Sequence, residues 1–159
     1  MSRRWALLLF LLVWGLFAAV CFWTGVSTAK AAEVYGGDSI ACGAAQAASM
    51  PVRCRVGAGS CEIAQKVPKG LWGWVVLSAG VNDQGRCVRQ VRASVGPAAR
   101  VIWIVSPPRY THARAAQLAT GQTYGDRFVT YVPGRDGLHP RSYPELVRAV
   151  HATEALPGN

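Results

Sequence analysis

Acidic side chains and metal-binding patterns are both scarce in this chain of 159 residues. Eight aspartates and glutamates stand against 17 lysines and arginines, which gives a formal net charge of +9. The cysteines form no Cys-x-x-Cys pair and the three histidines show no ligand spacing with them, which argues against a zinc site. The sequence also has no internal repeat, low-complexity segment or linker, as expected for one folded domain. It predicts neither a bound metal nor a cofactor.

Only the N-terminus has a long stretch without charge. Arg3 and Arg4 are followed by uncharged residues 5–23, and then by small residues placed for cleavage after Ala31. This pattern predicts a signal peptide over residues 1–31, a single domain over residues 32–159, and a periplasmic or secreted protein. The run is also near the length that spans a bilayer, so an uncleaved anchor that holds the protein at the membrane is the alternative.

Positive charge persists without the leader. Residues 32–159 hold fourteen basic and eight acidic side chains, a net charge of about +6. Arg86, Arg89 and Arg92 recur at helical spacing, which predicts one exposed basic face. Such a surface suits an envelope protein that works near anionic lipid or polysaccharide, whereas an exported location argues against a nucleic-acid partner.

Four cysteines remain beyond the leader: Cys42, Cys54, Cys61 and Cys87. An even number in an exported chain predicts two disulfides. The spacing leaves all three possible pairings open.

Apolar segments alternate with helical patterns along the rest of the chain. Strands are predicted at residues 34–37, 51–56, 71–79, 101–105 and 127–132. Helices are predicted after Ser39, over 61–67, from about 86 to 95, from a Thr111 N-cap to a Gly121 stop, and after the capping box that Ser142 begins. This order predicts a three-layer α/β/α fold with a five-stranded parallel sheet, in which Trp72, Trp74 and Trp103 belong to the core.

Polar residues follow several of these strands. In a parallel sheet the carboxyl ends of the strands share one edge, where ligands bind. There Ser39 offers a nucleophilic hydroxyl, His139 a general base, and Asp136 a carboxylate that orients the imidazole. The N–H groups of Ser39 and Gly59, with the side-chain amide of Asn82, would form an oxyanion hole.

Four motifs in this order resemble the SGNH (GDSL-type) hydrolases, over nearly all of the chain beyond the leader. They are Gly37-Asp38-Ser39-Ile40, Gly59 with Gly57 as the alternative, Gly80-Val81-Asn82-Asp83, and Asp136 to His139 followed by Pro140. The resemblance implies a flavodoxin-like fold and a Ser39–His139–Asp136 triad. The short gap between the first two motifs, the four cysteines and the small size depart from the family, and leave the substrate open.

Two functions are therefore expected as alternatives. The first is a serine esterase that removes acetyl or another short acyl group from a small ester or an envelope glycan. The second is an exported binding domain with the same fold and no turnover. Arg109 and Tyr110, in the loop after the fourth strand, are predicted to bind a hydroxyl-rich or anionic leaving group; a merely solvated Arg109 is the alternative.

Overall fold

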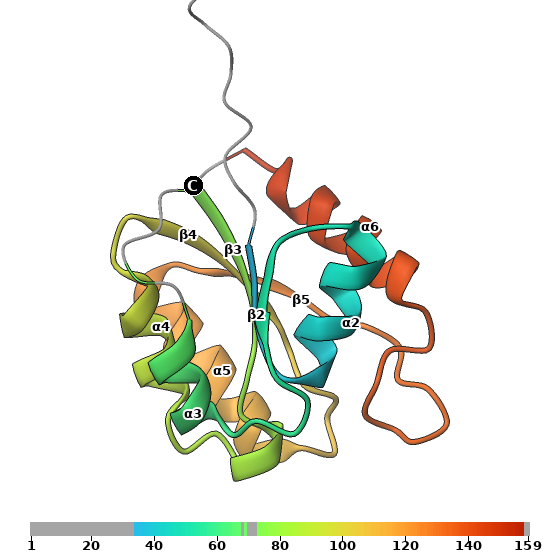
Figure 1. Ribbon diagram of the computed structural model, residues 1–159, viewed down its shortest axis with the longest axis horizontal. Helices are drawn as coiled ribbons and strands as arrows, with labels where there is room; N and C mark the ends of the chain where they lie inside the picture. The colour runs from blue at the N-terminus through green and yellow to red at the C-terminus, as the bar shows by residue number, and fades with distance from the viewer. Residues whose placement is uncertain (1–33, 68, 70–72, 158–159) are drawn as a thin grey trace, which may run out of the picture. The chain divides into compact units, whose positions relative to one another are not determined.

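A five-stranded, all-parallel sheet forms the centre of the molecule (Figure 1). The computed structural model describes residues 34–67, 69 and 73–157, so the predicted leader and Trp72 lie outside the described residues. The strands are β1 (Val34–Gly37), β2 (Val52–Cys54), β3 (Gly73–Ser78), β4 (Ala99–Ile104) and β5 (Arg127–Val129). Their order across the sheet is β2-β1-β3-β4-β5, the flavodoxin-like arrangement. The predicted parallel α/β fold is confirmed.

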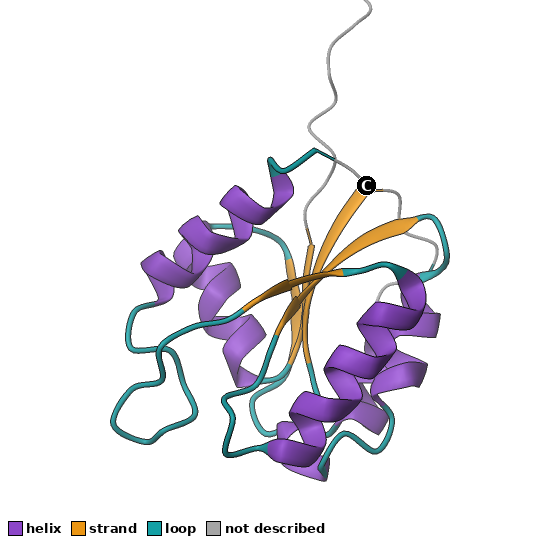
Figure 2. Cartoon of the chain, turned by 180° about the vertical axis from the view of Figure 1, so that it is seen from behind, coloured by secondary structure: helices purple, strands orange, loops and turns teal. Residues whose placement is uncertain are grey.

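Helices cover both faces of the sheet (Figure 2). They are α2 (Ser39–Ala48), α3 (Ser60–Lys66), α4 (Val88–Val95), α5 (Thr111–Tyr124) and α6 (Tyr143–Glu154). Helices α3, α4 and α5 pack side by side on one face, and α2 packs with α6 on the other. None of the helices in the described part of the chain is both long and apolar enough to span a membrane.

Strands β3 and β4 are buried on both sides, as the apolar runs in their sequences predict. Val75, Leu77 and Trp103 point to the core under α3 and α4. Val76 and Ile102 point to the opposite core under α2 and α6. Because successive strand residues face opposite sides, only a strand covered on both faces has no polar position in its pattern.

Several element ends differ from the sequence prediction. Strand β2 ends at Cys54 and β5 at Val129, so both are shorter than expected. Helix α5 runs past Gly121 and ends at Gly125, whose φ is 68°. Gly121 lacks a side chain for a different reason, since a Cβ there would lie 2.5 Å from the ring of Phe128. Its role is close packing of the helix on the sheet.

The predicted basic face is wrong at Arg92. This side chain is 3% exposed, and its Nε lies 2.7 Å from Oδ2 of the equally buried Asp126. The guanidinium also donates to the carbonyl oxygen of Gly96 at 2.9 Å, and Trp103 donates its indole N–H to Asp126. Of the three arginines, Arg89 alone is both helical and exposed, because α4 begins at Val88 and Arg86 precedes it. The helical spacing of these three arginines therefore does not correspond to one solvent-exposed face of a helix.

Two disulfides are present, as predicted. Cys42 in α2 pairs with Cys54 at the end of β2, and Cys61 in α3 pairs with Cys87, the residue before α4. Of the three pairings left open by the sequence, the observed one joins neighbouring parts of the fold: α2 with β2, and α3 with the residue before α4.

Candidate active site

The loops that follow the strands meet at one edge of the sheet, because all five strands run in the same direction. This edge holds the beginning of α2, the loop from Cys54 to α3, the short 3₁₀ helix Val81–Asp83 after β3, residues 106–110 after β4, and residues 130–142 after β5. Every site residue predicted from the sequence lies in one of these segments.

Gly37 allows β1 to turn directly into α2. Its φ is 143°, and a Cβ at this position would lie 1.8 Å from the carbonyl oxygen of Ser78, so no other residue fits. The neighbouring Gly36 lies in the strand and does not have a positive φ. Asp38 then caps α2 by accepting the N–H of Ile40 at 3.0 Å. Ser39 thus becomes the first residue of the helix.

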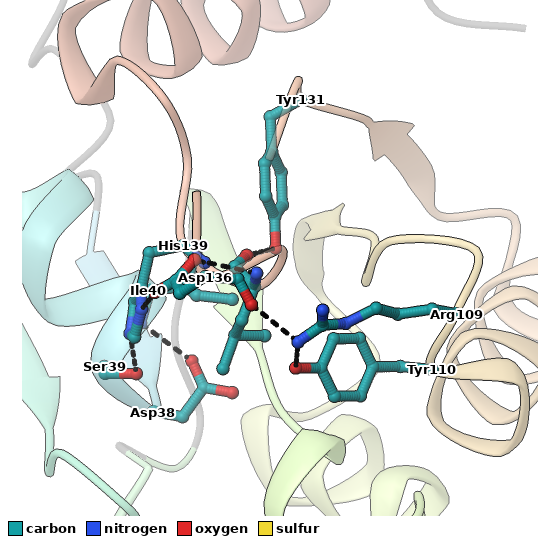
Figure 3. A network of polar contacts seen from close by, with 9 residues as sticks. Asp38, Ser39, Ile40, Arg109, Tyr110, Tyr131, Asp136 and His139 are labelled. Atoms are coloured by element: carbon teal, nitrogen blue, oxygen red, sulfur yellow. Dashed lines mark hydrogen bonds and ion pairs between the residues drawn. The ribbon is translucent and has the colours of Figure 1, made fainter. Parts of the chain in front are cut away.

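Ser39, His139 and Asp136 form a continuous relay although the first two are 100 positions apart in the sequence (Figure 3). Ser39 Oγ lies 2.9 Å from His139 Nε2, and His139 Nδ1 lies 2.5 Å from Asp136 Oδ2. With the imidazole proton on Nδ1 and donated to Asp136, Nε2 is left to accept the serine hydroxyl proton. The relay is open to solvent, since the side chains of His139 and Asp136 are 39% and 53% exposed.

Asp136 is held as an anion by the residues that follow it. The hydrogen bond from His139 and the N–H of Leu138 lower the pKa of Asp136 to about 2. Its Oδ1 accepts the N–H groups of Leu138 and His139 at 2.9 and 3.0 Å. Oδ1 therefore stabilises the turn, and Oδ2 is left to accept the imidazole N–H.

Two side chains outside this turn, Arg109 and Tyr131, hold it in place (Figure 3). Arg109 donates from Nη2 to the carbonyl oxygen of Asp136 at 2.7 Å, and Tyr131 donates its hydroxyl to the carbonyl oxygen of Leu138 at 2.7 Å. Gly137 has φ 69°, and a Cβ there would lie 2.2 Å from Arg109 Nη1. The turn is therefore built to receive the guanidinium at close range.

Arg109 and Tyr110, the predicted substrate-binding pair, lie against the relay loop. Arg109 Nη2 also donates to the Tyr110 hydroxyl at 2.6 Å, and its guanidinium lies 4.8 Å from the centre of the Tyr110 ring. The hydrogen bonds of Arg109 thus go to the protein, and they tie the loop after β4 to the loop after β5.

Asn82 and Asp83 connect the turn after β3 to the loop before α3. Asn82 donates from Nδ2 to the carbonyl oxygen of Ala58 at 2.9 Å, which uses one of its two amide protons. Asp83 accepts the Ser60 hydroxyl at 2.8 Å and the Cys61 N–H at 3.3 Å. The two residues thereby tie the turn after β3 to the Ala58–Gly59 peptide and to the first residues of α3.

The two candidate glycines of the second motif have different surroundings. Gly57 has φ 76° and open space where a Cβ would stand, so its backbone conformation explains the glycine. Gly59 has an ordinary φ of −78°, but a Cβ there would lie 3.0 Å from Asp83 Oδ2. Close approach to the Asn82–Asp83 turn is thus specific to Gly59.

The sequence indicated no role for Tyr131, and it placed Asp38 only within the first motif. Asp38 is 1% exposed; its Oδ1 accepts the hydroxyl of Ser78 at 2.8 Å, and its Oδ2 has no hydrogen-bond partner among the described residues. Burial raises the pKa of Asp38 to about 6, against the lowering effect of Ser78. Tyr131 had been predicted inside a strand, which hid its contact with the relay loop.

No group of three or more His, Cys, Asp or Glu side chains is placed to hold a metal ion within the described ranges. Comparison with family models, curated proteins and solved structures found no match to this chain.

Proposed function

We propose that this protein is an exported serine esterase of the SGNH type that hydrolyses esters of short acyl groups. The observation that carries the proposal is the relay from Ser39 through His139 to Asp136, with both contacts within hydrogen-bond distance. This is the arrangement by which a weak nucleophile is activated: the base lies beside the hydroxyl, and a third group orients the base.

The reaction would proceed in two halves. Ser39 Oγ forms a bond to the ester carbonyl carbon while its proton passes to His139 Nε2, and Asp136 stabilises the imidazolium. The bond from carbon to the leaving oxygen then breaks, and Nε2 returns the proton to that oxygen, so an alcohol departs. Water next gives a proton to Nε2 and attacks the acyl carbon. The bond from that carbon to Ser39 Oγ then breaks, Nε2 returns the proton to Oγ, and the acid leaves.

Three N–H groups support the negative oxygen that forms in each half. The Ser39 N–H belongs to the first turn of α2, where helical N–H groups lack an acceptor within the helix and the dipole favours negative charge. Gly59 adds a second backbone N–H, and Asn82 adds the amide proton that is not used by Ala58. Donors fixed in advance in this way are usually the largest contribution to acyl transfer.

Export is part of the same proposal. The two disulfides suit an oxidising compartment, and the uncharged run at residues 5–23 suits a leader. A short acyl group is proposed because few residues lie outside the sheet and its helices to enclose a long chain.

The test is hydrolysis of para-nitrophenyl acetate together with labelling by a sulfonyl fluoride. We expect turnover by the purified protein, loss of turnover in Ser39→Ala, and a label on Ser39 in the mass spectrum of the digested protein. Ser94→Ala on α4 is the matched control, because it removes a serine hydroxyl away from the site. Undiminished activity in Ser39→Ala would refute the nucleophile, and a folded protein with neither label nor turnover would favour the non-catalytic binding domain.

A further inference from the structure

An open hollow of about 790 Å³ lies beside His139, on the side of the relay loop. Pro133, Gly134 and Pro140 form part of its wall, and the two cationic residues that line it are Arg135 and Arg141. The loop is internally bonded, since Gly134 donates its N–H to the carbonyl oxygen of His139 at 2.7 Å and Arg141 donates its N–H to that of Val132 at 2.9 Å. The backbone that carries both arginines is therefore fixed relative to the imidazole.

Both guanidinium groups are available to a ligand. Arg135 and Arg141 are exposed, and neither forms an ion pair with a carboxylate in the part of the chain that the structure describes. Arg109, the third arginine near the relay, is already bonded to the Asp136 carbonyl oxygen and the Tyr110 hydroxyl. Asp136 is the carboxylate in the wall of the hollow, and it is bonded to His139.

The position of His139 decides which part of a substrate enters this hollow. In the proposed reaction, Nε2 returns its proton to the oxygen of the departing alcohol, so that oxygen must lie within hydrogen-bond distance of His139. In the same reaction the acyl carbon would bond to Ser39 Oγ, and its oxygen would face the proposed oxyanion donors instead. The hollow beside His139 therefore faces the alcohol part of the ester.

We propose that the preferred substrates are esters whose alcohol part carries an anionic group, a carboxylate or a phosphate, which Arg135 and Arg141 bind. The inference rests on the proposed esterase function. It adds that the substrate carries a negative charge and that this charge lies on the alcohol part. Arginine suits this role because its planar guanidinium makes paired, charge-assisted hydrogen bonds with carboxylate and phosphate oxygens. Acidic sugars and phosphate-bearing polyols share this chemistry.

The experiment measures hydrolysis of three acetyl esters and one succinyl ester by the full chain and by the variant Arg135→Gln/Arg141→Gln. Para-acetoxybenzamide is neutral, para-acetoxybenzoate carries a carboxylate on the alcohol part, and para-acetoxyphenyl phosphate carries a phosphate there. The para-nitrophenyl monoester of succinate carries its charge on the acyl part instead. Arg89→Gln/Arg148→Gln is the control, because it removes two exposed arginines from helices and so the same net charge.

We expect the loop variant to lower kcat/KM about tenfold for the two esters charged on the alcohol part, as two exposed charge pairs would, and less than about twofold for the benzamide and the succinate. High salt should reduce the same two rates in the unmodified protein. Whichever of these two esters loses more kcat/KM in the loop variant identifies its group, carboxylate or phosphate, as the preferred one. Equal losses on all four esters, no loss on either alcohol-side anion, or an equal effect of the control variant would overturn the inference. Absence of hydrolysis of every ester by the unmodified protein would instead refute the esterase function.

Discussion

Breaking the Cys61–Cys87 disulfide is expected to lower both the stability of the protein and its turnover. The bond closes a loop of 26 positions, and the chain-entropy relation gives a stabilisation of roughly 3.5 kcal/mol for a loop of this length. The Cys42–Cys54 bond closes only 12 positions, for which the same relation gives roughly 2.8 kcal/mol. The double variant Cys61→Ser/Cys87→Ser should therefore be the less stable of the two.

Turnover should separate the two variants more clearly than stability does. Cys61–Cys87 joins the segment just after Gly59 to the segment just after Asn82, and Ser60 bridges the same segments by accepting the Cys87 N–H at 2.8 Å and donating to Asp83. Loss of this bond frees the two proposed oxyanion donors to move apart, and misplacement by about 1 Å costs on the order of a hundredfold in rate. The Cys42–Cys54 bond instead joins α2 to β2, and it leaves the spacing of those donors intact.

The assay is urea unfolding of both double variants, with kcat for para-nitrophenyl acetate measured in buffer where each is fully folded. We expect a kcat at least about tenfold lower for Cys61→Ser/Cys87→Ser, and a kcat within about threefold of the unmodified protein for Cys42→Ser/Cys54→Ser. Equal turnover in the two folded variants would show that the covalent link does not position the donors. A reversed order of stability would refute the loop-length reasoning.

Three further predictions concern single side chains. Asn82→Ala should lower kcat by about a hundredfold to a thousandfold with little change in KM, and an effect confined to KM would assign Asn82 to substrate binding instead. Arg109→Ala should lower kcat on neutral and anionic esters alike, by about tenfold, with partial rescue in Arg109→Lys, because the guanidinium holds the Asp136 carbonyl oxygen. A rise in KM for anionic esters alone would instead support the substrate-binding role predicted from the sequence. Arg92→Met should destabilise the protein by roughly 3 to 5 kcal/mol in urea unfolding, since it leaves Asp126 charged and buried, and a loss below about 1 kcal/mol would show that the pair is not needed.

The fold was predictable because its strongest determinant is local in the sequence. The apolar runs in residues 73–77 and 101–104 have no polar position, and such runs occur where helices cover a strand on both sides. Arg92 was unpredictable because its partner Asp126 is 34 positions away and nothing near Arg92 marks the contact. A pattern shows that a residue is helical; it does not show what faces it.

The candidate site was predictable where the chemistry resides in side chains. Ser39, Asn82 and His139 each follow a strand, and the parallel sheet brings such residues to one edge. The contacts of Arg109 and Tyr131 were not predictable, because both donate to main-chain carbonyl oxygens, which every residue has. The disulfide pairing likewise depends on which loops become neighbours, so it appeared only with the fold.

Asp38 provides a test of stability that is independent of any substrate. Burial raises its pKa to about 6 in the folded protein, whereas its ordinary value is 3.8. Between these values the folded state keeps the proton that the unfolded state has released, so stability falls as the pH rises from about 4 to about 6 and then levels off. A difference of about two pH units corresponds to roughly 3 kcal/mol.

The isosteric change Asp38→Asn keeps the Oδ1 that accepts from Ile40 and Ser78, and removes the charge. The variant should therefore gain stability relative to the unmodified protein as the pH rises from about 4 to about 7, by roughly 3 kcal/mol, because burial disfavours the ionised carboxylate and the amide does not ionise. Urea unfolding of both proteins across this range measures the difference directly, and comparing the two cancels the titration of Asp136 and Glu62, whose pKa values are lowered in the folded state. A stability difference that stays constant with pH would mean that Asp38 is ionised throughout, and that Ser78 and the first turn of α2 stabilise its charge as well as water does.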